Sequence, residues 1–369
     1  MKRMRLAVIG VGYLGRIHAR LARDFPGWQL CGVVDPQPQA RQAVQAELGV
    51  PAYPDLAALD SPIDAAIVAT PSATHYSVAA QLLQEGVHLL VEKPLTLNVG
   101  DAQDLIRLAE QHQCVLHVGH VERFNPALVA LRPHLPRPEL ILAQRVGSFT
   151  GRSLDVGAVL DLMIHDLDLV LSLLGDDPLV GVQATGAAVV GPNEDWAQAQ
   201  LTFASGAIAH LFASRVGWRP RRVAEIYAPQ WMAEIDFASR KAWLAHPDSP
   251  PQATFEQPAR PATPAPDRFA EEFLHLQELP VPQTNPLLEE QRQFHLAITE
   301  GVSEGVTGEQ ALRAIHVAER ILTILAAQRM RAEVRKTAAA DTAEVVAPLG
   351  LAALRGPHWG RRAIRRKAG

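Results

Sequence analysis

The sequence predicts an α/β protein in two parts: a first domain with a doubly wound parallel sheet, and a second domain of α+β type with an open, mainly antiparallel sheet. Three observations predict this arrangement. Strand-like and helix-like segments alternate as far as residue 121, a glycine-rich turn follows the first strand, and from residue 122 strand-like segments follow one another with few helices between them. Alternation is typical of parallel sheets, whereas strands without intervening helices pair in antiparallel fashion.

The first expected strand, residues 5–10, opens directly into a turn with the spacing G-x-G-x-x-G and then into a helix over residues 16–23. In such a turn one glycine allows the tight bend, one lets a pyrophosphate approach the backbone, and one lets helix and strand pack closely. The phosphates then accept hydrogen bonds from free N–H groups at the start of the helix. We therefore expect a Rossmann domain that binds a dinucleotide through Gly10, Gly12, Tyr13, Leu14 and Gly15.

An acidic residue closes the second expected strand. Asp35 follows the strand-like residues 29–34 and stands twenty residues after Gly15. A carboxylate at this place accepts both ribose hydroxyls of the adenosine half of the cofactor and repels a 2′-phosphate. In residues 36–42 only Arg41 offers a partner for such a phosphate. The sequence therefore predicts NAD rather than NADP as the cofactor.

A third strand, residues 63–69, also ends in a loop with polar groups. Thr70, Pro71 and His75 follow it, and we expect them beside the nicotinamide half of the cofactor. Further helices over residues 38–48, 75–85 and 101–111 and strands over residues 87–92 and 114–119 complete a first domain of residues 1–121.

The strand over residues 87–92 ends in Glu92, Lys93 and Pro94. Proline cannot donate to a strand ladder and disfavours helix in the residue before it, so the strand closes here. In parallel sheets this end faces the ligand crevice. Lys93 is then either a solvated loop charge or a cation beside the nicotinamide that polarises a carbonyl forming in the transition state. We expect both Glu92 and Lys93 at the cofactor.

The second domain, residues 122–330, has one helix over residues 157–174 among its strands and two closing helices over residues 285–300 and 308–328. Residues 247–266 hold seven prolines and are too rich in proline for regular structure. The expected strands cover residues 139–149, 179–190, 195–204, 206–216, 222–229 and 231–238.

The helix over residues 157–174 carries candidate acid–base chemistry. At about 100° per residue, Asp161, His165 and Asp168 lie within roughly 60° of one another. The helix is then either a surface helix with solvated side chains or the lining of a cleft. A neutral imidazole oriented by a carboxylate is suited to act as a general base, and Asp161 or Asp168 could also bind substrate hydroxyls. No third His or Cys stands at ligand spacing, so no metal is predicted.

The composition bounds the class of protein. A chain of 369 residues, 48% hydrophobic and 20% charged, is long enough for two folded domains. Cys31 and Cys114 are expected to be reduced core thiols, because two cysteines cannot form the dense staple of a small secreted fold. No apolar run approaches the roughly 18 residues of a membrane helix, and the basic N-terminus lacks a cleavage pattern. We expect a cytoplasmic protein without a nucleic-acid partner.

The glycine turn, Glu92-Lys93-Pro94 and the helix with Asp161, His165 and Asp168 together resemble the glucose-fructose oxidoreductase, inositol dehydrogenase and MocA family over about residues 5–328. The resemblance implies an NAD-dependent dehydrogenase that acts on CH–OH groups. It also implies Lys93 and His165 as the catalytic pair, and homo-oligomers formed through the sheet of the second domain.

Residues 118–126 and 161–169 are similar to a bacterial branch of this family that oxidises the 3-hydroxyl of UDP-N-acetylglucosamine. This resemblance implies Glu122, Arg123 and Asn125 near the sugar, although Arg123 is equally well a surface arginine at the domain junction. It also implies that the 3-keto sugar passes to a pyridoxal-phosphate aminotransferase in lipid A biosynthesis.

Three functions stay open on the sequence. The chain is a nucleotide-sugar 3-dehydrogenase, a dehydrogenase of a free polyol or sugar such as an inositol, or an NAD-binding regulator without activity. Retention of Lys93 and His165 argues against the regulator. Recognition of a pyrophosphate could come from scattered arginines, namely Arg145, Arg152, Arg215, Arg219, Arg221 and Arg222.

The C-terminal segment, residues 331–369, is expected to be a flexible basic tail. Residues 329–369 together carry ten Lys/Arg against three acidic residues, whereas the whole chain has a net charge of −4. Basic residues beside Trp359 also suit an anionic membrane surface, but a mobile terminus without a binding role is the plainer interpretation.

Overall fold

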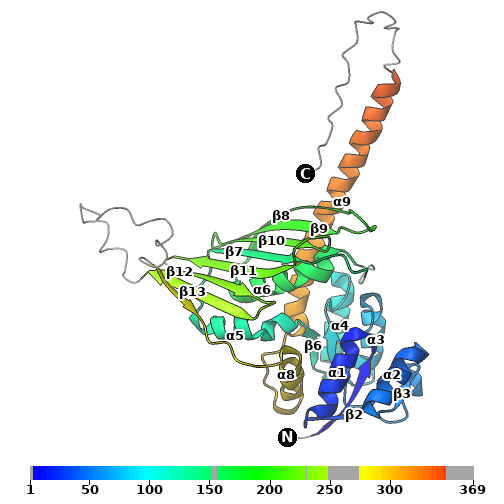
Figure 1. The fold of residues 1–369 in the computed structure, drawn as a ribbon. Helices are drawn as coiled ribbons and strands as arrows, with labels where there is room; N and C mark the ends of the chain where they lie inside the picture. Colours follow the sequence, from blue (N-terminus) through cyan, green and yellow to red (C-terminus); the bar gives the residue numbers. More distant parts are fainter. Residues whose placement is uncertain (1–2, 152–155, 230, 248–273, 346–369) are drawn as a thin grey trace, which may run out of the picture. The chain divides into compact units, whose positions relative to one another are not determined.

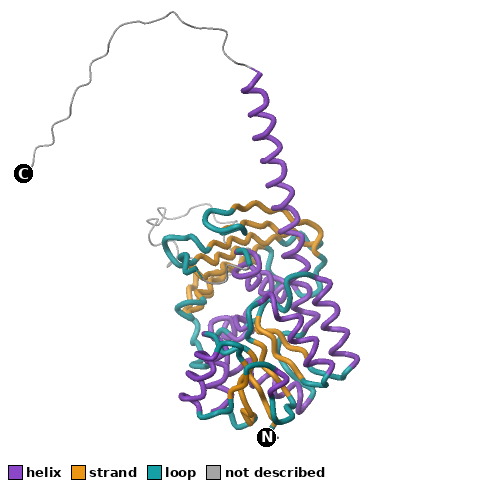
Figure 2. Tube along the Cα trace, turned by 90° about the vertical axis from the view of Figure 1, so that its right-hand side faces the viewer, coloured by secondary structure: helices purple, strands orange, loops and turns teal. Residues whose placement is uncertain are grey.

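The computed structural model describes residues 3–151, 156–229, 231–247 and 274–345. They form two sheets with helices packed against both (Figure 1). Residues 1–325 make one compact unit and residues 326–369 another. Within the first unit the two sheets, orange in Figure 2, lie in separate layers.

The N-terminal sheet has six strands in the order β3-β2-β1-β4-β5-β6, and every pair is parallel. The strand order reverses between β1 and β4, so their carboxyl ends border the crevice where such sheets bind ligands. The predicted doubly wound parallel sheet is confirmed. The strands are β1 (Met4–Ile9), β2 (Trp28–Val34), β3 (Ala52–Tyr53), β4 (Ala65–Val68), β5 (His88–Glu92) and β6 (Leu116–Gly119); the crossover helices are α1 (Tyr13–Asp24), α2 (Pro38–Leu48), α3 (His75–Gln84) and α4 (Val99–Gln111).

The second sheet has eight strands in the order β14-β13-β12-β11-β7-β10-β9-β8. Only β7 and β10 pair in parallel, so the predicted open, mainly antiparallel sheet is confirmed. Its strands are β7 (Leu140–Val146), β8 (Leu179–Ala187), β9 (Trp196–Phe203), β10 (Ile208–Ser214), β11 (Arg221–Ala228), β12 (Trp231–Asp236), β13 (Lys241–Pro247) and β14 (Leu274–Glu278).

Two of these strands, β13 and β14, were not predicted. Both adjoin the proline-rich stretch, and β14 holds only two apolar residues, too short an alternation to separate from a loop. Most of the stretch 247–266 lies outside the described residues. Two helices of the second part of the chain are α5 (Pro126–Leu131) and α6 (Ile164–Leu174). The remaining connections contain short helical turns: η1 (Leu56–Ala58), η2 (Ser72–Thr74), η3 (Val121–Phe124), η4 (Arg132–His134) and η5 (Val159–Met163).

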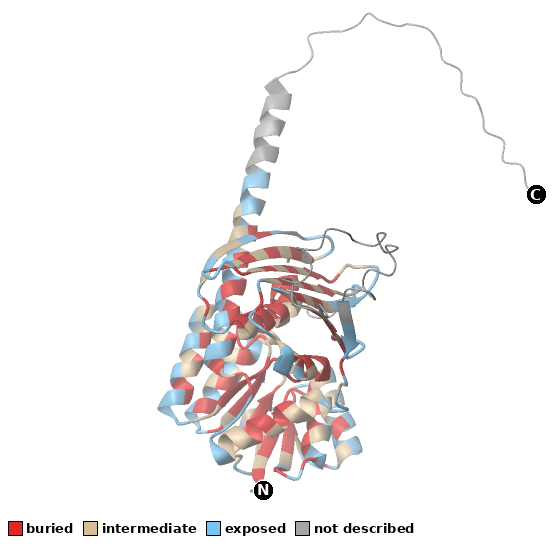
Figure 3. Cartoon of the chain, turned by 90° about the vertical axis from the view of Figure 1, so that its left-hand side faces the viewer, coloured by how far each residue is buried: buried red, intermediate tan, exposed pale blue. Residues whose placement is uncertain are grey.

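One face of the second sheet is closed by α6. Buried and partly exposed residues alternate along β9 and β10, and this alternation is visible as the red and tan positions in Figure 3. Arg145 on β7 reaches Asp166 on α6, which identifies the face with odd-numbered β7 residues as the covered one. The strands therefore have the period of two that a half-buried sheet requires.

Helix α8 (Pro286–Glu300) follows the second sheet in the chain but packs against α1 and β5 of the first domain. Phe294 joins a core cluster with Leu6 and Trp28, and the Phe294 and Trp28 ring centroids are 5.7 Å apart. The first core is thus completed by a helix that lies far away in sequence. The domain boundaries at 121 and 330 remain a prediction.

Helix α9 runs from Gly308 to Val345, well beyond the expected end at residue 328. It therefore takes in residues 331–345 of the segment expected to be a flexible tail, while residues 346–369 lie outside the described part. None of the helices in the described part of the chain combines the length and the apolar composition that crossing a bilayer requires.

Replacing Phe294 by Ala should lower the free energy of unfolding by about 3–5 kcal/mol, because a fully buried aromatic ring leaves a cavity next to Trp28. Urea titration followed by tryptophan fluorescence measures the change. Val302→Ala, which shortens an exposed apolar side chain just after the same helix, is the control and should stay within about 0.5 kcal/mol of the wild type. A small loss in Phe294→Ala would mean that α8 does not complete this core.

Candidate active site

The glycine turn between β1 and α1 has the geometry that a dinucleotide needs. Gly10 has φ +84°, and a Cβ there would stand 2.6 Å from the carbonyl oxygen of Ala69. A Cβ on Gly15 would collide with the carbonyl oxygen of Gly10, whereas one on Gly12 would meet nothing within 4 Å. Gly12 is also the N-cap of α1 and no side chain caps it, so the open space borders free N–H groups. Tyr13 and Leu14 form the adjoining first turn of the helix.

Asp35 lies at the carboxyl end of β2, where its carboxylate reaches the glycine turn. Oδ2 accepts the Val11 N–H at 2.9 Å and Oδ1 accepts the Gln37 N–H at 2.8 Å. Each oxygen keeps a lone pair for a ribose hydroxyl. Arg41, the candidate partner for a 2′-phosphate, instead donates to the carbonyl oxygen of Asp35 at 2.6 Å. These residues fit NAD.

The loop after β4 contains a hydroxyl group without a hydrogen-bond partner in the described part of the chain, on Thr70, and a histidine with a structural role, His75. The Thr70 hydroxyl oxygen is buried and has no partner among the described residues, as expected of a group that bonds to a bound molecule. His75 is almost fully buried, with Nδ1 at 2.8 Å from Pro94 O and Nε2 at 2.9 Å from Thr70 O. It ties two crevice loops together, while Pro71 is exposed at the start of η2.

Lys93 is held in the interior of the site rather than solvated. Its ammonium donates to the backbone oxygen of Asp161 at 2.6 Å and to Oδ1 of the same residue at 3.1 Å, and its side chain is only 17% exposed. Asp161 lies in η5, a π-helical turn that directly precedes α6. The contact joins the end of β5 to the helix that bears His165.

His165 lies at the start of α6, with Nδ1 buried and without a partner among the described residues. Burial and then the positive charges of Lys93 and Arg145 lower the pKa of His165 well below its usual value. The imidazole is therefore neutral at pH 7, and only a neutral imidazole accepts a proton.

His120 belongs to the same cluster, and the sequence reasoning did not single it out as a site residue. Its ring centroid is 6.3 Å from that of His165, the planes meet at 86°, and its Nδ1 lies 3.9 Å from Asp168 Oδ2. Burial lowers the pKa of His120, although the charge of Asp168 acts in the opposite direction. Its position in the sequence could have identified it as a site residue, because His120 follows the carboxyl end of β6 as Lys93 follows that of β5.

Arg123 and Asp168 pair with each other. Arg123 Nε lies 2.6 Å from Oδ2 of Asp168 and Nη2 lies 2.9 Å from Oδ1, which is a bidentate contact between η3 and α6. Asp168 is 3% exposed. Binding of a sugar by these two residues stays a prediction, since each already has a partner.

Glu122 and Asn125 form hydrogen bonds with residues in or just after strands of the second sheet. Glu122 accepts from Arg145 at 2.8 Å and from Asn125 at 2.9 Å, and Arg145 forms a second, buried ion pair with Asp166 at 2.8 Å. Asn125 caps α5 by accepting the Ala127 N–H. Their contact with a sugar likewise stays a prediction.

The other candidate arginines differ in setting. Arg215 is buried and pairs with Asp195 at 2.7 Å. Arg219, Arg221 and Arg222 are exposed at one end of the second sheet, and Arg152 lies outside the described residues.

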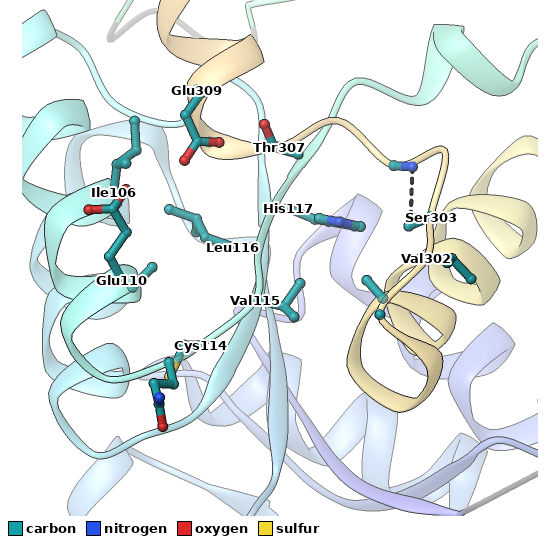
Figure 4. A pocket seen from close by; sticks show the side chains of 16 residues that line it. Ile106, Glu110, Cys114, Val115, Leu116, His117, Val302, Ser303, Thr307 and Glu309 are labelled. Carbon is teal, nitrogen blue, oxygen red and sulfur yellow. Dashed lines mark hydrogen bonds between the residues drawn. The ribbon is translucent and has the colours of Figure 1, made fainter.

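A cavity of about 410 Å³ lies at the amino end of β6, away from the crevice side of the sheet. Figure 4 shows Glu110 and Cys114 on one side of the cavity and the loop with Val302 and Ser303 on the other, with His117 between them. In that loop the Gly305 N–H donates to the Ser303 hydroxyl at 2.8 Å. Burial lowers the pKa of His117 to about 4. None of the residues predicted for catalysis lines this cavity.

Comparisons with known proteins agree with this geometry. Residues 4–120 match an oxidoreductase family with an NAD-binding Rossmann fold, and residues 128–232 match the GFO/IDH/MocA C-terminal domain. UDP-N-acetylglucosamine 3-dehydrogenase of Acidithiobacillus ferrooxidans is 41% identical over 247 residues, which cover 67% of this chain and 78% of that protein. The chain belongs to the Gfo/Idh/MocA oxidoreductase family.

Two further comparisons describe this Gfo/Idh/MocA member. A solved structure of the same Acidithiobacillus dehydrogenase has a TM-score of 0.79 and 34% identity, covering 89% of this chain and 99% of that one. The NAD⁺-dependent scyllo-inositol 2-dehydrogenase of Bacillus subtilis is 30% identical over 234 residues, 58% of this chain and 67% of that protein. The predictions of the family, the fold, NAD and an NAD-dependent dehydrogenase are confirmed.

Changing Asp35 to Ser together with Pro36 to Arg should shift the ratio of NADPH to NADH affinity by at least about tenfold towards NADPH. The double change removes a carboxylate that repels a 2′-phosphate and adds a cation, and tenfold corresponds to about 1.4 kcal/mol. Nicotinamide fluorescence titrations measure both affinities. Asp24→Ser, at an exposed acid ending α1, is the control; a wild type that already prefers NADPH would contradict the role of Asp35.

An NMR titration of the histidines should show His165 neutral at pH 6.5. The midpoint of its titration should rise in Lys93→Met, because the charge of Lys93 adds to burial in lowering the pKa. His165→Asn assigns the resonance. Lys241→Met, which removes a lysine paired with Glu278 on the second sheet, should leave the midpoint unchanged. A wild-type midpoint at or above 6.5 would refute the neutral imidazole.

Proposed function

We propose that the chain oxidises the 3-hydroxyl of UDP-N-acetylglucosamine to a ketone. The main support for a dehydrogenase with Lys93 and His165 as catalytic residues is the contact of Lys93 with Asp161, just before the helix that bears His165. The sugar itself is supported by the 41% identical relative, which bears that activity in its name.

Oxidation of a secondary alcohol removes a hydride and a proton, and NAD supplies the hydride acceptor when it is bound. His165 takes the proton at Nε2, because Nδ1 is buried. An ammonium group has three N–H donors, and Asp161 engages two of them. The third is left for the substrate oxygen, where it stabilises the charge that develops as the proton leaves.

A dehydrogenase of a free polyol is the second candidate, and the 30% identical scyllo-inositol 2-dehydrogenase supports it. The same pair of residues would serve both substrates. An NAD-binding regulator without activity fits less well, because such a protein has no need of a lysine held against Asp161 beside a neutral histidine.

The proposal extends to the setting of the enzyme. The 3-keto sugar is a substrate for a pyridoxal-phosphate aminotransferase, which would place the chain in lipid A biosynthesis in the cytoplasm. The face of the second sheet opposite α6 exposes parts of Leu142, Phe212 and Tyr227, and this apolar surface supports a homo-oligomer formed through the sheet.

Purified protein incubated with NAD should reduce it with UDP-N-acetylglucosamine at a higher kcat/KM than with UDP-glucose, UDP-glucuronate, myo-inositol or scyllo-inositol. Lys93→Met and His165→Asn should bind NADH like the wild type and lose turnover by about 10²–10⁴-fold, the usual scale for a lost acid–base group or charge stabiliser. Absorbance of NADH and mass spectrometry of the product measure both effects.

Lys241→Met is the control with full turnover. Turnover with inositols alone would establish the polyol reading instead. Retained turnover in His165→Asn would mean that another group is the base. Weaker NADH binding in Lys93→Met would mean that this lysine binds the cofactor.

A further inference from the structure

Three ionisable side chains meet in the interior behind the catalytic lysine: His18 of α1, Glu92 of β5 and Glu290 of α8. One nitrogen or oxygen atom of each lies within 4.8 Å of the others. All three are buried, with exposed fractions of 0%, 7% and 3%. Lys93 is the next residue after Glu92, so this cluster adjoins the proposed active site from inside.

The hydrogen bonds of His18 fix which ring nitrogen carries its proton. The side-chain amide nitrogen of Gln291 lies 3.0 Å from His18 Nδ1 and 3.2 Å from the His18 carbonyl oxygen. Exchanging the amide oxygen and nitrogen would set oxygen against oxygen, so the amide donates and Nδ1 accepts. The proton is therefore on Nε2, which donates to Glu92 Oε1 at 2.8 Å.

The two carboxyl groups have unequal surroundings. Glu92 accepts from His18 Nε2 and, at 3.3 Å, from the Lys93 N–H, so it has two donors within the described part of the chain. Neither oxygen of Glu290 has a donor among the described residues. Burial and then the charge of Glu92 raise the pKa of Glu290 well above its usual 4.5. If two carboxyl groups here hold one proton, it resides on Glu290.

A cation is the other way to neutralise two buried carboxylates. A metal at this place would need the lone pair of His18 Nε2, and that nitrogen already carries the proton donated to Glu92. The donors of Gln291 block transfer of the proton to Nδ1. The hydrogen-bond pattern thus favours a proton over a metal ion.

We propose that Glu290 is a positioning residue: its neutral carboxyl group donates a hydrogen bond towards Glu92 and so fixes the end of β5 that carries Lys93. A small rotation of one side chain brings the two groups into contact, and a direct hydrogen bond between two carboxyl groups requires a proton, which Glu290 supplies. The catalytic part of this inference rests on the role proposed for Lys93, whereas the protonation of Glu290 does not.

The cluster also joins three parts of the molecule. His18 stands on the helix that begins at the glycine turn, Glu92 ends the strand before Lys93, and Glu290 belongs to the helix that completes the first core. Loss of the donor on α8 would leave Glu92 held, within the described ranges, only by His18 and the Lys93 N–H. Displacement of a catalytic group by about 1 Å can cost about 10²-fold in rate.

Infrared difference spectra test the protonation directly, because a carboxylic acid has a carbonyl stretch that a carboxylate lacks. The wild type at about pH 7.5 should show a band that is missing in Glu290→Gln and retained in Glu289→Gln. Glu289 is the matched control, since it adjoins Glu290 on α8 but pairs with Arg292 at 2.6 Å. Absence of the band in the wild type would overturn the proposal.

Stability provides an independent readout. A carboxyl group with a raised pKa in the folded state contributes stability that is lost as pH rises above its unfolded value of about 4.5. The urea midpoint of Glu290→Gln should therefore rise relative to the wild type between about pH 5 and pH 8. Glu92 of β5 and His18 of α1 are the titratable groups of the cluster that face Glu290. A difference independent of pH would count against the neutral carboxyl.

The positioning role is tested by turnover. Glu290→Leu, which keeps volume but not the donor, should lose about 10-fold to 100-fold in kcat. Glu290→Gln, which keeps a donor, should stay within about threefold of the wild type. Wild-type kcat in a folded Glu290→Leu would refute the positioning role, as would a stoichiometric metal in the purified enzyme that disappears in Glu290→Gln. Lack of turnover in the wild type with every substrate would instead refute the proposed function, and the infrared band would still report on Glu290.

Discussion

The hydrogen bonds from the Lys93 ammonium to Asp161 are the contact on which the candidate site depends. Lys93 belongs to the carboxyl edge of the parallel sheet, and Asp161 belongs to the π turn before α6. The ammonium binds the backbone oxygen as well as the carboxylate, so part of the contact does not depend on the side chain of Asp161. The contact connects the end of β5 to the turn before α6, and so it helps to fix the position of His165 relative to the cofactor crevice.

Buried charge pairs surround this contact and define the join between the domains. Arg145 links Glu122 to Asp166, and Arg123 links η3 to α6 through Asp168. Such pairs contribute little net stability because desolvation offsets their attraction, but loss of one partner leaves a buried charge uncompensated. Their value here lies in fixed geometry, and the charge of Arg145 adds to the burial that lowers the pKa of His165.

The parts of the fold that the sequence predicted are those with local causes. The glycine turn, Asp35 after β2 and Lys93 after β5 each follow from residues within a few positions of one another. The strands β13 and β14 lacked a sufficient local pattern, and the docking of α8 on α1 has no local signal at all. In the same way the sequence singled out neither His120 nor Glu290, because their contacts are with residues far away in the sequence.

The return of α8 to the first domain has a consequence for how the protein is made. Trp28 and Phe294 are both fully buried and pack against each other, although one lies near the start of the chain and the other near its end. Domains usually fold as they leave the ribosome, N-terminal first. Here the core around Trp28, which α1 covers only in part, stays incomplete until the second sheet has been synthesised and α8 has emerged. The nascent chain is therefore exposed to aggregation, and open to chaperones, for most of its own translation.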